Sequence, residues 1–217
     1  MPSPRELSRT KMMRSILSLG FAQLDAGGAE AVNLRAVARE LGVVSSALYR
    51  YVKNRDDLLT LLIEDAFRQL ADAVQHEDPR SLPALAQAMR RWALSHPQRW
   101  ALVYGSPIAG YFAPERTIDQ GTRVMRMMIE QLAAASPSAP PPPTNRALLS
   151  DLFGIQREWA PDLDIAVIEL ALDGWTHLIG LISAEVFGQL GRDTLSEPGE
   201  FFTRAVERLA ASLGLPA

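Results

Sequence analysis

The chain has 217 residues, of which 47% are hydrophobic and 22% charged, a composition typical of a folded globular protein rather than a disordered one. It has no cysteine, which excludes disulfides, thiolate catalysis and cysteine-ligated zinc. The net charge of −3 conceals an asymmetry, because residues 1–55 carry nine basic and four acidic side chains whereas the remainder is acidic. A cationic module on an anionic body suits a protein that approaches nucleic acid through its N-terminal end.

The N-terminal residues are basic, but their apolar positions follow helical spacing rather than a continuous run, so we expect no cleaved leader. The most apolar region, residues 163–190, is interrupted by acidic residues, and no uncharged stretch reaches the roughly 18–20 residues that span a bilayer. We therefore expect a cytoplasmic protein without a membrane partner.

Helical periodicity runs through nearly the whole chain, so the expected fold class is all-α. The first expected helix covers residues 7–24 and ends at Gly27 and Gly28. A long helix is expected from Arg55 to Gln75, and proline-rich residues 136–143 are expected to form an extended surface loop.

Two short helices are expected between the first helix and the long one. Asn33 is a suitable N-cap for a helix from Leu34 to Leu41, and Gly42 ends it. A second short helix over residues 46–52 begins only three or four residues later. Helices joined so closely must cross steeply, which is the helix-turn-helix arrangement.

The outward face of the second short helix carries hydroxyls, phenols and a guanidinium, which can meet base edges or phosphates in a major groove. These candidate DNA contacts are Ser45, Ser46, Ala47, Tyr49, Arg50 and Tyr51. Lys53 and Arg55 stand where the next helix opens, and a phosphate could be held there against free backbone N–H groups.

The run from Leu41 to Arg55, together with Leu58 and Leu59, resembles the signature of the tetracycline-repressor-like (TetR) family. The resemblance implies a three-helix DNA-binding domain over residues 1–55 and a helical ligand-binding and dimerisation domain over residues 56–217. It also implies that Arg35 contacts DNA together with the residues of the second short helix, and that Lys53 and Arg55 contact phosphates. It implies a homodimer that binds a palindromic operator in double-stranded DNA and is released by a small-molecule effector. The departures at Arg50 and at Tyr51–Val52 leave the operator sequence open.

Two segments in the larger domain, residues 92–102 and 174–180, resemble the WHG-type subgroup of that family. The two C-terminal helices are expected to pair with their copies in a twofold four-helix bundle. The predicted dimer interface consists of Val167, Ala171, Gly174, Leu178, Leu181, Phe202, Val206, Leu209 and Leu213. The alternative, that both helices satisfy their apolar faces within one subunit, stays open.

Methionine and aromatic side chains suit an adaptable apolar cavity, and the resemblance points to the core of the C-terminal domain for a ligand. The predicted ligand wall consists of Met89, Trp92, Tyr104, Tyr111, Met125, Met128, Trp175 and His177. Few polar anchors accompany them, so we expect an apolar or aromatic effector. The same residues could instead be plain core.

An enzyme is the rival class, but the chain offers little for catalysis. His76, His96 and His177 lie far apart without a second ligand at metal-binding spacing, and Gly105–Ser106 lacks the setting of a nucleophile elbow. We expect no catalytic residue, no metal and no cofactor. A helical module that binds only proteins, or an enzyme without DNA binding, remains the alternative to a ligand-released repressor, and activation remains open as well.

Overall fold

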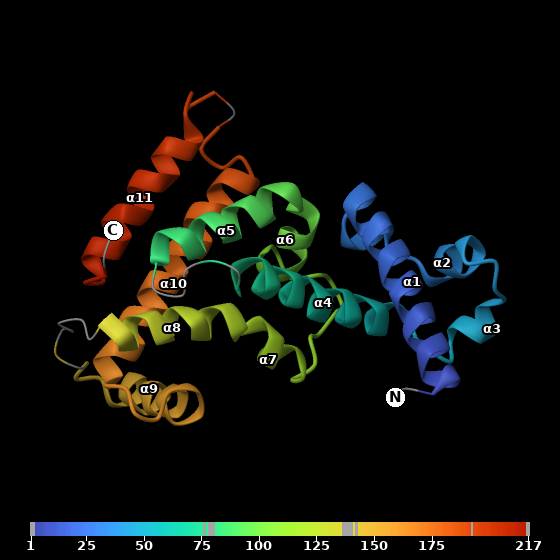
Figure 1. The fold of residues 1–217 in the computed structure, drawn as a ribbon, viewed down its shortest axis with the longest axis horizontal. Coiled ribbons are helices and arrows are strands. Elements are labelled where there is room, and N and C mark those ends of the chain that lie inside the picture. The colour runs from blue at the N-terminus through green and yellow to red at the C-terminus, as the bar shows by residue number, and fades with distance from the viewer. Residues whose placement is uncertain are drawn as a thin grey trace. The chain divides into compact units, whose positions relative to one another are not determined.

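The computed structural model describes residues 3–75, 77, 81–135, 141, 143–191 and 193–215, and within these ranges it contains helices and no strand (Figure 1). The predicted all-α class is confirmed. Residues 136–140 and 142 of the predicted proline-rich loop, and His76, lie outside the described residues.

Packing divides the chain into two compact units, Met1–Gln69 with His96–Gly121 and Leu70–Ser95 with Thr122–Ala217. Helix α4 (Arg55–Gln75) is continuous and contributes residues to both units. The predicted domain boundary after residue 55 falls at the first residue of this helix and stays a prediction.

The first unit holds the N-terminal helices and the first part of α4. Its other elements are α1 (Pro4–Gly27), the 3₁₀ helix η1 (Ala29–Ala31), α2 (Leu34–Glu40), α3 (Ser45–Leu48), α6 (Pro97–Tyr104) and α7 (Thr117–Gly121). The interior of this unit is formed by side chains that are fully buried, including Ile16, Leu24, Leu48, Leu58, Leu62 and Trp100.

Helix α6 joins α1 to α4 through one side chain. The Arg99 guanidinium donates to Asp25 Oδ2 at 2.7 Å and to Gln69 Oε1 at 2.8 Å, and it lies 4.3 Å from the centroid of the Phe21 ring. The adjacent Trp100 is fully buried, and its ring centroid lies 4.5 Å from that of Tyr104. The base of the N-terminal helices is therefore braced by α6.

The second unit is built around α10 (Ile165–Val186), which packs against every other helix that lies wholly in the unit. Those helices are α5 (Leu82–Ser95), α8 (Arg123–Ala135), α9 (Arg146–Trp159) and α11 (Pro198–Ser212). By length and apolar composition alone α10 could cross a membrane, but it carries Glu169, Asp173 and Glu185. An ion pair at 2.6 Å between Arg90 Nη2 and Glu185 Oε1 ties α5 to α10.

Helices α10 and α11 approach closely at Gly174. A Cβ atom added there would lie 2.7 Å from Leu213 Cδ1, and Leu213 is itself buried. Gly174→Leu is therefore expected to lower the free energy of unfolding by about 1–3 kcal/mol, because it overfills a packed core.

Chemical denaturation followed by circular dichroism measures this effect. Gly154→Leu is the matched control, since a Cβ at the helical Gly154 would meet nothing within 4 Å. The control is expected to be neutral or stabilising by up to about 1 kcal/mol, because glycine is a poor helix former. Equal effects of the two changes would contradict the packing at Gly174.

Candidate DNA-binding site

The reversal between α2 and α3 is formed by a glycine with left-handed backbone geometry. Gly42 has φ of 67°, and its N–H donates to Arg39 O at 3.1 Å while Val43 N–H donates to Ala38 O at 3.0 Å. This pairing satisfies the last carbonyls of α2 in a Schellman motif. The position favours glycine because residues with a Cβ atom rarely adopt a positive φ.

Helix α3 is shorter than the predicted 46–52, because its regular part ends at Leu48. The N–H groups of Tyr51 and Val52 both donate to Leu48 O, at 2.8 and 3.1 Å, so the chain turns more tightly there. Leu48 and Val52 are buried at either end of this turn. The two anchors hold the intervening residues Tyr49–Tyr51 at the surface of the unit.

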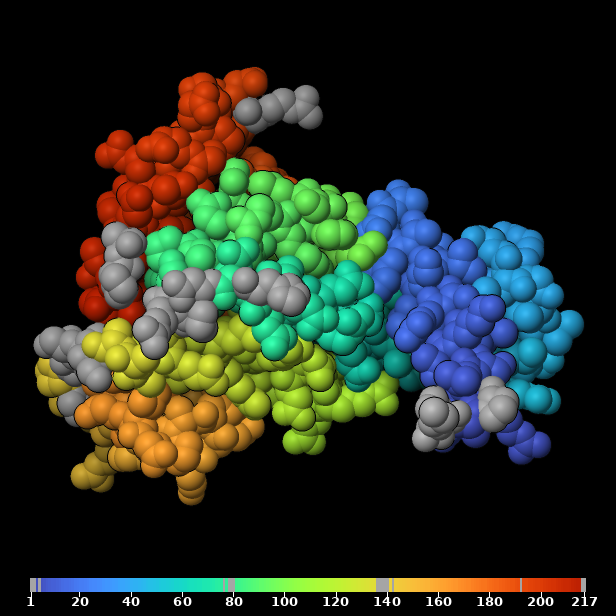
Figure 2. All heavy atoms as spheres, viewed as in Figure 1, coloured from blue at the N-terminus to red at the C-terminus, as the bar shows by residue number. Residues whose placement is uncertain are grey.

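Six of the nine predicted contacts are exposed, and they lie in α2, in α3 and in the chain between α3 and α4, which Figure 2 shows at the surface in blue. Ala47, Tyr51 and Arg55 are partly buried, and the exposed ones are Arg35, Ser45, Ser46, Tyr49, Arg50 and Lys53. The hydroxyl, phenol and guanidinium groups that were predicted to read DNA are therefore accessible.

A groove of about 370 Å³ brings the predicted phosphate contacts together. It runs between the start of α2, the end of α3 and the start of α4, and its lining residues are Val32, Asn33, Leu34, Arg35, Tyr49, Lys53, Asn54 and Arg55. Three of these are basic and none is acidic, which suits an anionic partner. The groove thus joins residues that lie twenty positions apart in the sequence.

Arg55 supports this groove from behind. Its guanidinium donates to Ala29 O at 2.7 Å and to Val32 O at 3.2 Å, so two of its donors are engaged by the chain that leads into α2. The start of α4 is fixed separately, since Asn54 Oδ1 accepts from Asp57 N–H at 2.8 Å and Asp57 Oδ2 accepts from Lys53 N–H at 2.9 Å. Lys53 is consequently the more accessible of the two predicted phosphate contacts.

One residue that the sequence analysis did not select lies against the site. The Arg9 guanidinium of α1 lies 5.7 Å from the centroid of the Tyr51 ring, a cation–π contact across 42 residues of sequence. The exposed side of α1 also carries Arg5, Lys11 and Arg14. The basic character of this segment could be seen in the sequence, but the pairing with Tyr51 could not.

Arg9→Leu is expected to weaken DNA binding by about threefold to tenfold, because it removes both a positive charge and the contact that holds Tyr51. Gel shifts of Arg9→Leu and Arg9→Lys measure this. The lysine variant keeps the charge and is expected to recover most of the affinity at low salt. Unchanged binding by Arg9→Leu would contradict the role of this contact.

The predicted ligand wall is divided between the two units. Met89, Trp92, Met125 and Met128 are buried in the second unit, whereas Tyr104 and Tyr111 belong to the first. Burial raises the pKa of Tyr104, and burial likewise raises the pKa of Tyr111, whose hydroxyl lies 2.9 Å from that of Thr60.

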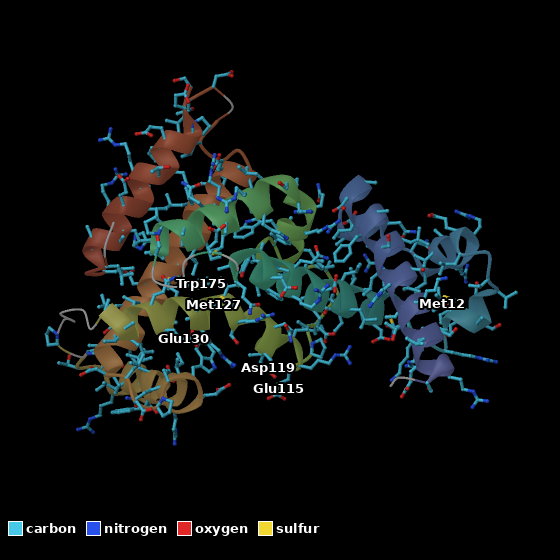
Figure 3. All side chains as sticks on the ribbon, viewed as in Figure 1. Met12, Glu115, Asp119, Met127, Glu130 and Trp175 are labelled. Atoms are coloured by element: carbon cyan, nitrogen blue, oxygen red, sulfur yellow. The ribbon has the colours of Figure 1, made fainter. Side chains whose placement is uncertain are left out.

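The remaining two wall residues lie on α10. Trp175 is partly buried, and Figure 3 labels it in the second unit. His177 is exposed, and its Nδ1 lies 3.2 Å from the Asp173 carbonyl one turn earlier. The ligand role of all eight stays a prediction.

The predicted dimer interface lies mostly inside the subunit. Leu181 is partly buried, and the buried members are Val167, Ala171, Gly174, Leu178, Phe202, Val206, Leu209 and Leu213. Helix α10 and the end of α11 in one chain approach each other closely at Gly174 and Leu213, two of these positions. Their contact with a second copy stays a prediction.

Among the described residues no group of three His, Asp or Glu side chains is placed to hold a metal ion. The exposed segment offers hydroxyl groups, a phenol and positive charge for recognition through hydrogen bonds and charge. A tight turn between two short helices, an exposed second helix and a basic groove beside it define a helix-turn-helix DNA-binding protein.

Comparison with known proteins agrees with this class. Residues 16–62 match the bacterial regulatory proteins of the tetR family, and residues 82–209 match the tetracyclin repressor-like C-terminal domain. HTH-type transcriptional regulators of Mycobacterium tuberculosis and Mycobacterium bovis are each 40% identical to it, over 96% of this chain and 95% of their own. The chain belongs to the TetR family of transcriptional regulators, and its relatives are regulators rather than enzymes.

Solved structures share the fold over nearly the whole length. The crystal structure of a protein designated SCO4313 has a TM-score of 0.79 and 32% identity, covering 96% of this chain and all of that one. A TetR variant from Acinetobacter baumannii in complex with minocycline has a TM-score of 0.54 and 16% identity, covering 91% of this chain and 93% of that one. The latter similarity concerns the fold alone.

Proposed function

We propose that the protein is a cytoplasmic repressor that binds a palindromic operator as a homodimer and is released by a small, largely apolar ligand. The observation that carries the DNA-binding part is the basic groove of Arg35, Lys53 and Arg55 beside the exposed residues Tyr49 and Arg50. We propose that Arg35 and Lys53 contact DNA phosphates and that the turn after α3 contacts base edges. Arg55 supports the groove and reaches the phosphate with its remaining donors.

The homodimer is proposed from the surface that α10 and α11 leave uncovered. Only 39% of the most apolar stretch of α10 is buried within the subunit. A hollow of about 430 Å³ between the end of α10 and the start of α11 is lined by Leu181, Phe201 and Phe202, among others, and Phe201 is 40% exposed. Exposed apolar surface of this kind marks an interface.

Gly180 marks where the second copy would approach. It is exposed on α10, and a Cβ added to it would meet nothing within 4 Å, so a partner helix could come close to the backbone. In this arrangement most of the predicted interface residues lie just beneath the surface that the second copy contacts. Leu181 and Phe202 also line the hollow. A twofold pair of subunits would present two helix-turn-helix units to two half-sites.

Sedimentation velocity at micromolar concentration tests the dimer. The native protein is expected to be a dimer, and Gly180→Arg is expected to be a folded monomer that has lost tight binding to a palindrome. Gly154→Arg is the matched control, because Gly154 also has open space at its Cβ position but lies on α9. A monomeric native protein, or a dimeric Gly180→Arg variant, would overturn this interface.

Ligand release is proposed from linkage through α4. This helix begins beside the basic groove and ends at Gln75 in the second unit, so a ligand that favours one position of its C-terminal part also biases its N-terminal part. A TetR variant with the same fold binds minocycline, which supports a small-molecule effector for this chain. The resemblance of residues 92–102 and 174–180 to the WHG-type subgroup is part of the same proposal.

A further inference from the structure

The chain between α6 and α7 belongs to the first unit and contacts the first half of α4 there (Figure 1). Its later part forms a turn, in which the buried Thr117 donates to Pro114 O from its N–H at 3.0 Å and from its hydroxyl at 2.7 Å. Arg116 lies within this turn, and Figure 3 labels its neighbour Glu115. The turn therefore presents the Arg116 side chain to α4 from a fixed backbone.

Arg116 bridges two acidic residues of α4. Its Nε lies 2.8 Å from Glu64 Oε1, and its Nη2 donates to Asp57 Oδ1 at 3.4 Å. The Arg116 side chain is 56% exposed, so these ion pairs add little to the stability of the fold. Their consequence is instead geometric, because one planar guanidinium fixes the direction of two carboxylates.

Asp57 connects this bridge to the DNA-binding site. While its Oδ1 accepts from Arg116, its Oδ2 accepts from the Lys53 N–H at 2.9 Å. Lys53 lines the basic groove, whereas Arg116 does not. The Arg116 guanidinium thus holds the carboxylate that fixes the backbone of Lys53.

A second side chain of the same chain segment reaches the start of α4. The Tyr111 hydroxyl lies 2.9 Å from Thr60 Oγ1, and Thr60 itself donates to Asp56 O at 2.9 Å, so the tyrosine is the donor. Thr60 is only 3% exposed, so this contact is largely shielded from water. Asp56 and Asp57 both belong to the first turn of α4, so both paths from the segment end beside the groove.

We infer that Arg116 is a positioning residue for DNA binding, which acts through Asp57 to hold Lys53 where it contacts a phosphate. For its effect on DNA the inference rests on the proposed phosphate contact of Lys53. Its effect on the Lys53 backbone can be measured without DNA. A direct contact between Arg116 and DNA is the competing outcome, and the experiments separate the two.

Amide hydrogen exchange, followed by NMR on the full chain without DNA, tests the contact itself. Arg116→Leu is expected to speed exchange of the Lys53 N–H by about threefold or more, because the released Asp57 carboxylate accepts from it less often. Arg91→Leu is the matched control, since Arg91 is 60% exposed and forms its ion pair with Glu77, away from the start of α4. Unchanged exchange in Arg116→Leu, or equal acceleration in both variants, would overturn the inference.

Fluorescence anisotropy with a labelled duplex from the region upstream of the gene tests the effect on binding. The salt concentration is about 0.15 M, at which charges more than about 8 Å apart are largely screened. Arg116→Leu is expected to weaken binding by about threefold to tenfold, and to lower the salt slope no further than Lys53→Ala does. The double variant is expected to bind within about twofold of Lys53→Ala alone, because both changes act on one contact.

Losses that multiply in the double variant would overturn the inference, because they would give Arg116 a phosphate contact of its own. Full affinity of Arg116→Leu would refute it as well. A thermal midpoint within about 3 °C of the native value checks that the variant is folded, since the ion pairs are exposed. A native protein that binds no duplex would contradict the proposed function and the DNA role of Arg116, whereas faster exchange would still support its hold on the Lys53 backbone.

Discussion

Arg50→Ala is expected to weaken DNA binding by about 1–3 kcal/mol for each half-site, because an exposed guanidinium in the turn after α3 can meet a base edge or phosphate. Tyr49→Ala is expected to cause a loss of similar size, since Tyr49 lines the basic groove and is 46% exposed. Gel shifts with duplex DNA from the region upstream of the gene, repeated across a salt series, measure both effects.

The salt series distinguishes reading of bases from contact with phosphate. Lys53→Ala is expected to weaken binding to all sequences and to reduce the salt slope by about one, as removal of one phosphate contact does. Arg157→Ala changes an exposed arginine of α9 in the second unit and is the control. It should change neither the DNA affinity nor the salt slope. Binding unaffected by both Arg50→Ala and Tyr49→Ala would remove the turn after α3 from the interface.

Trp100→Ala is expected to lower the free energy of unfolding by about 3–5 kcal/mol, because it leaves a large cavity beneath α1 and removes the contact with Tyr104. Urea denaturation followed by far-UV circular dichroism measures the change. DNA binding is expected to decline at temperatures where the native protein is still folded, since α6 braces the helices that hold the site.

Trp100→Phe keeps most of the volume and is expected to lose less than half as much stability. Phe112→Ala provides the surface control, because Phe112 is 90% exposed and its removal leaves no cavity. A stability of Trp100→Ala within about 0.5 kcal/mol of the native protein, the usual range of surface changes, would contradict the bracing role of α6.

Local patterns predicted the helix-turn-helix because its determinants are close in sequence. Asn33 caps α2 through hydrogen bonds to Arg35 and Ala36 N–H groups, and Gly42 takes the left-handed geometry that ends the helix. The length of α3 could not be predicted from periodicity, because the tight turn at Leu48 depends on how Leu48 and Val52 are buried by other helices.

The roles of the C-terminal residues were harder to predict for a different reason. Helix α10 is apolar around much of its circumference, so sequence spacing alone cannot say which stripe meets α11 of the same chain and which stays uncovered.

The Arg99 cluster has a consequence for how the first unit responds to force. Since one guanidinium engages Asp25 of α1, Gln69 of α4 and the Phe21 ring, none of the three helices can shift without breaking a charged contact. The N-terminal helices should therefore open and close as a single cooperative foldon. A torque applied to the part of α4 in this unit would then reach the turn after α3 as a rigid rotation rather than be dissipated by bending between helices.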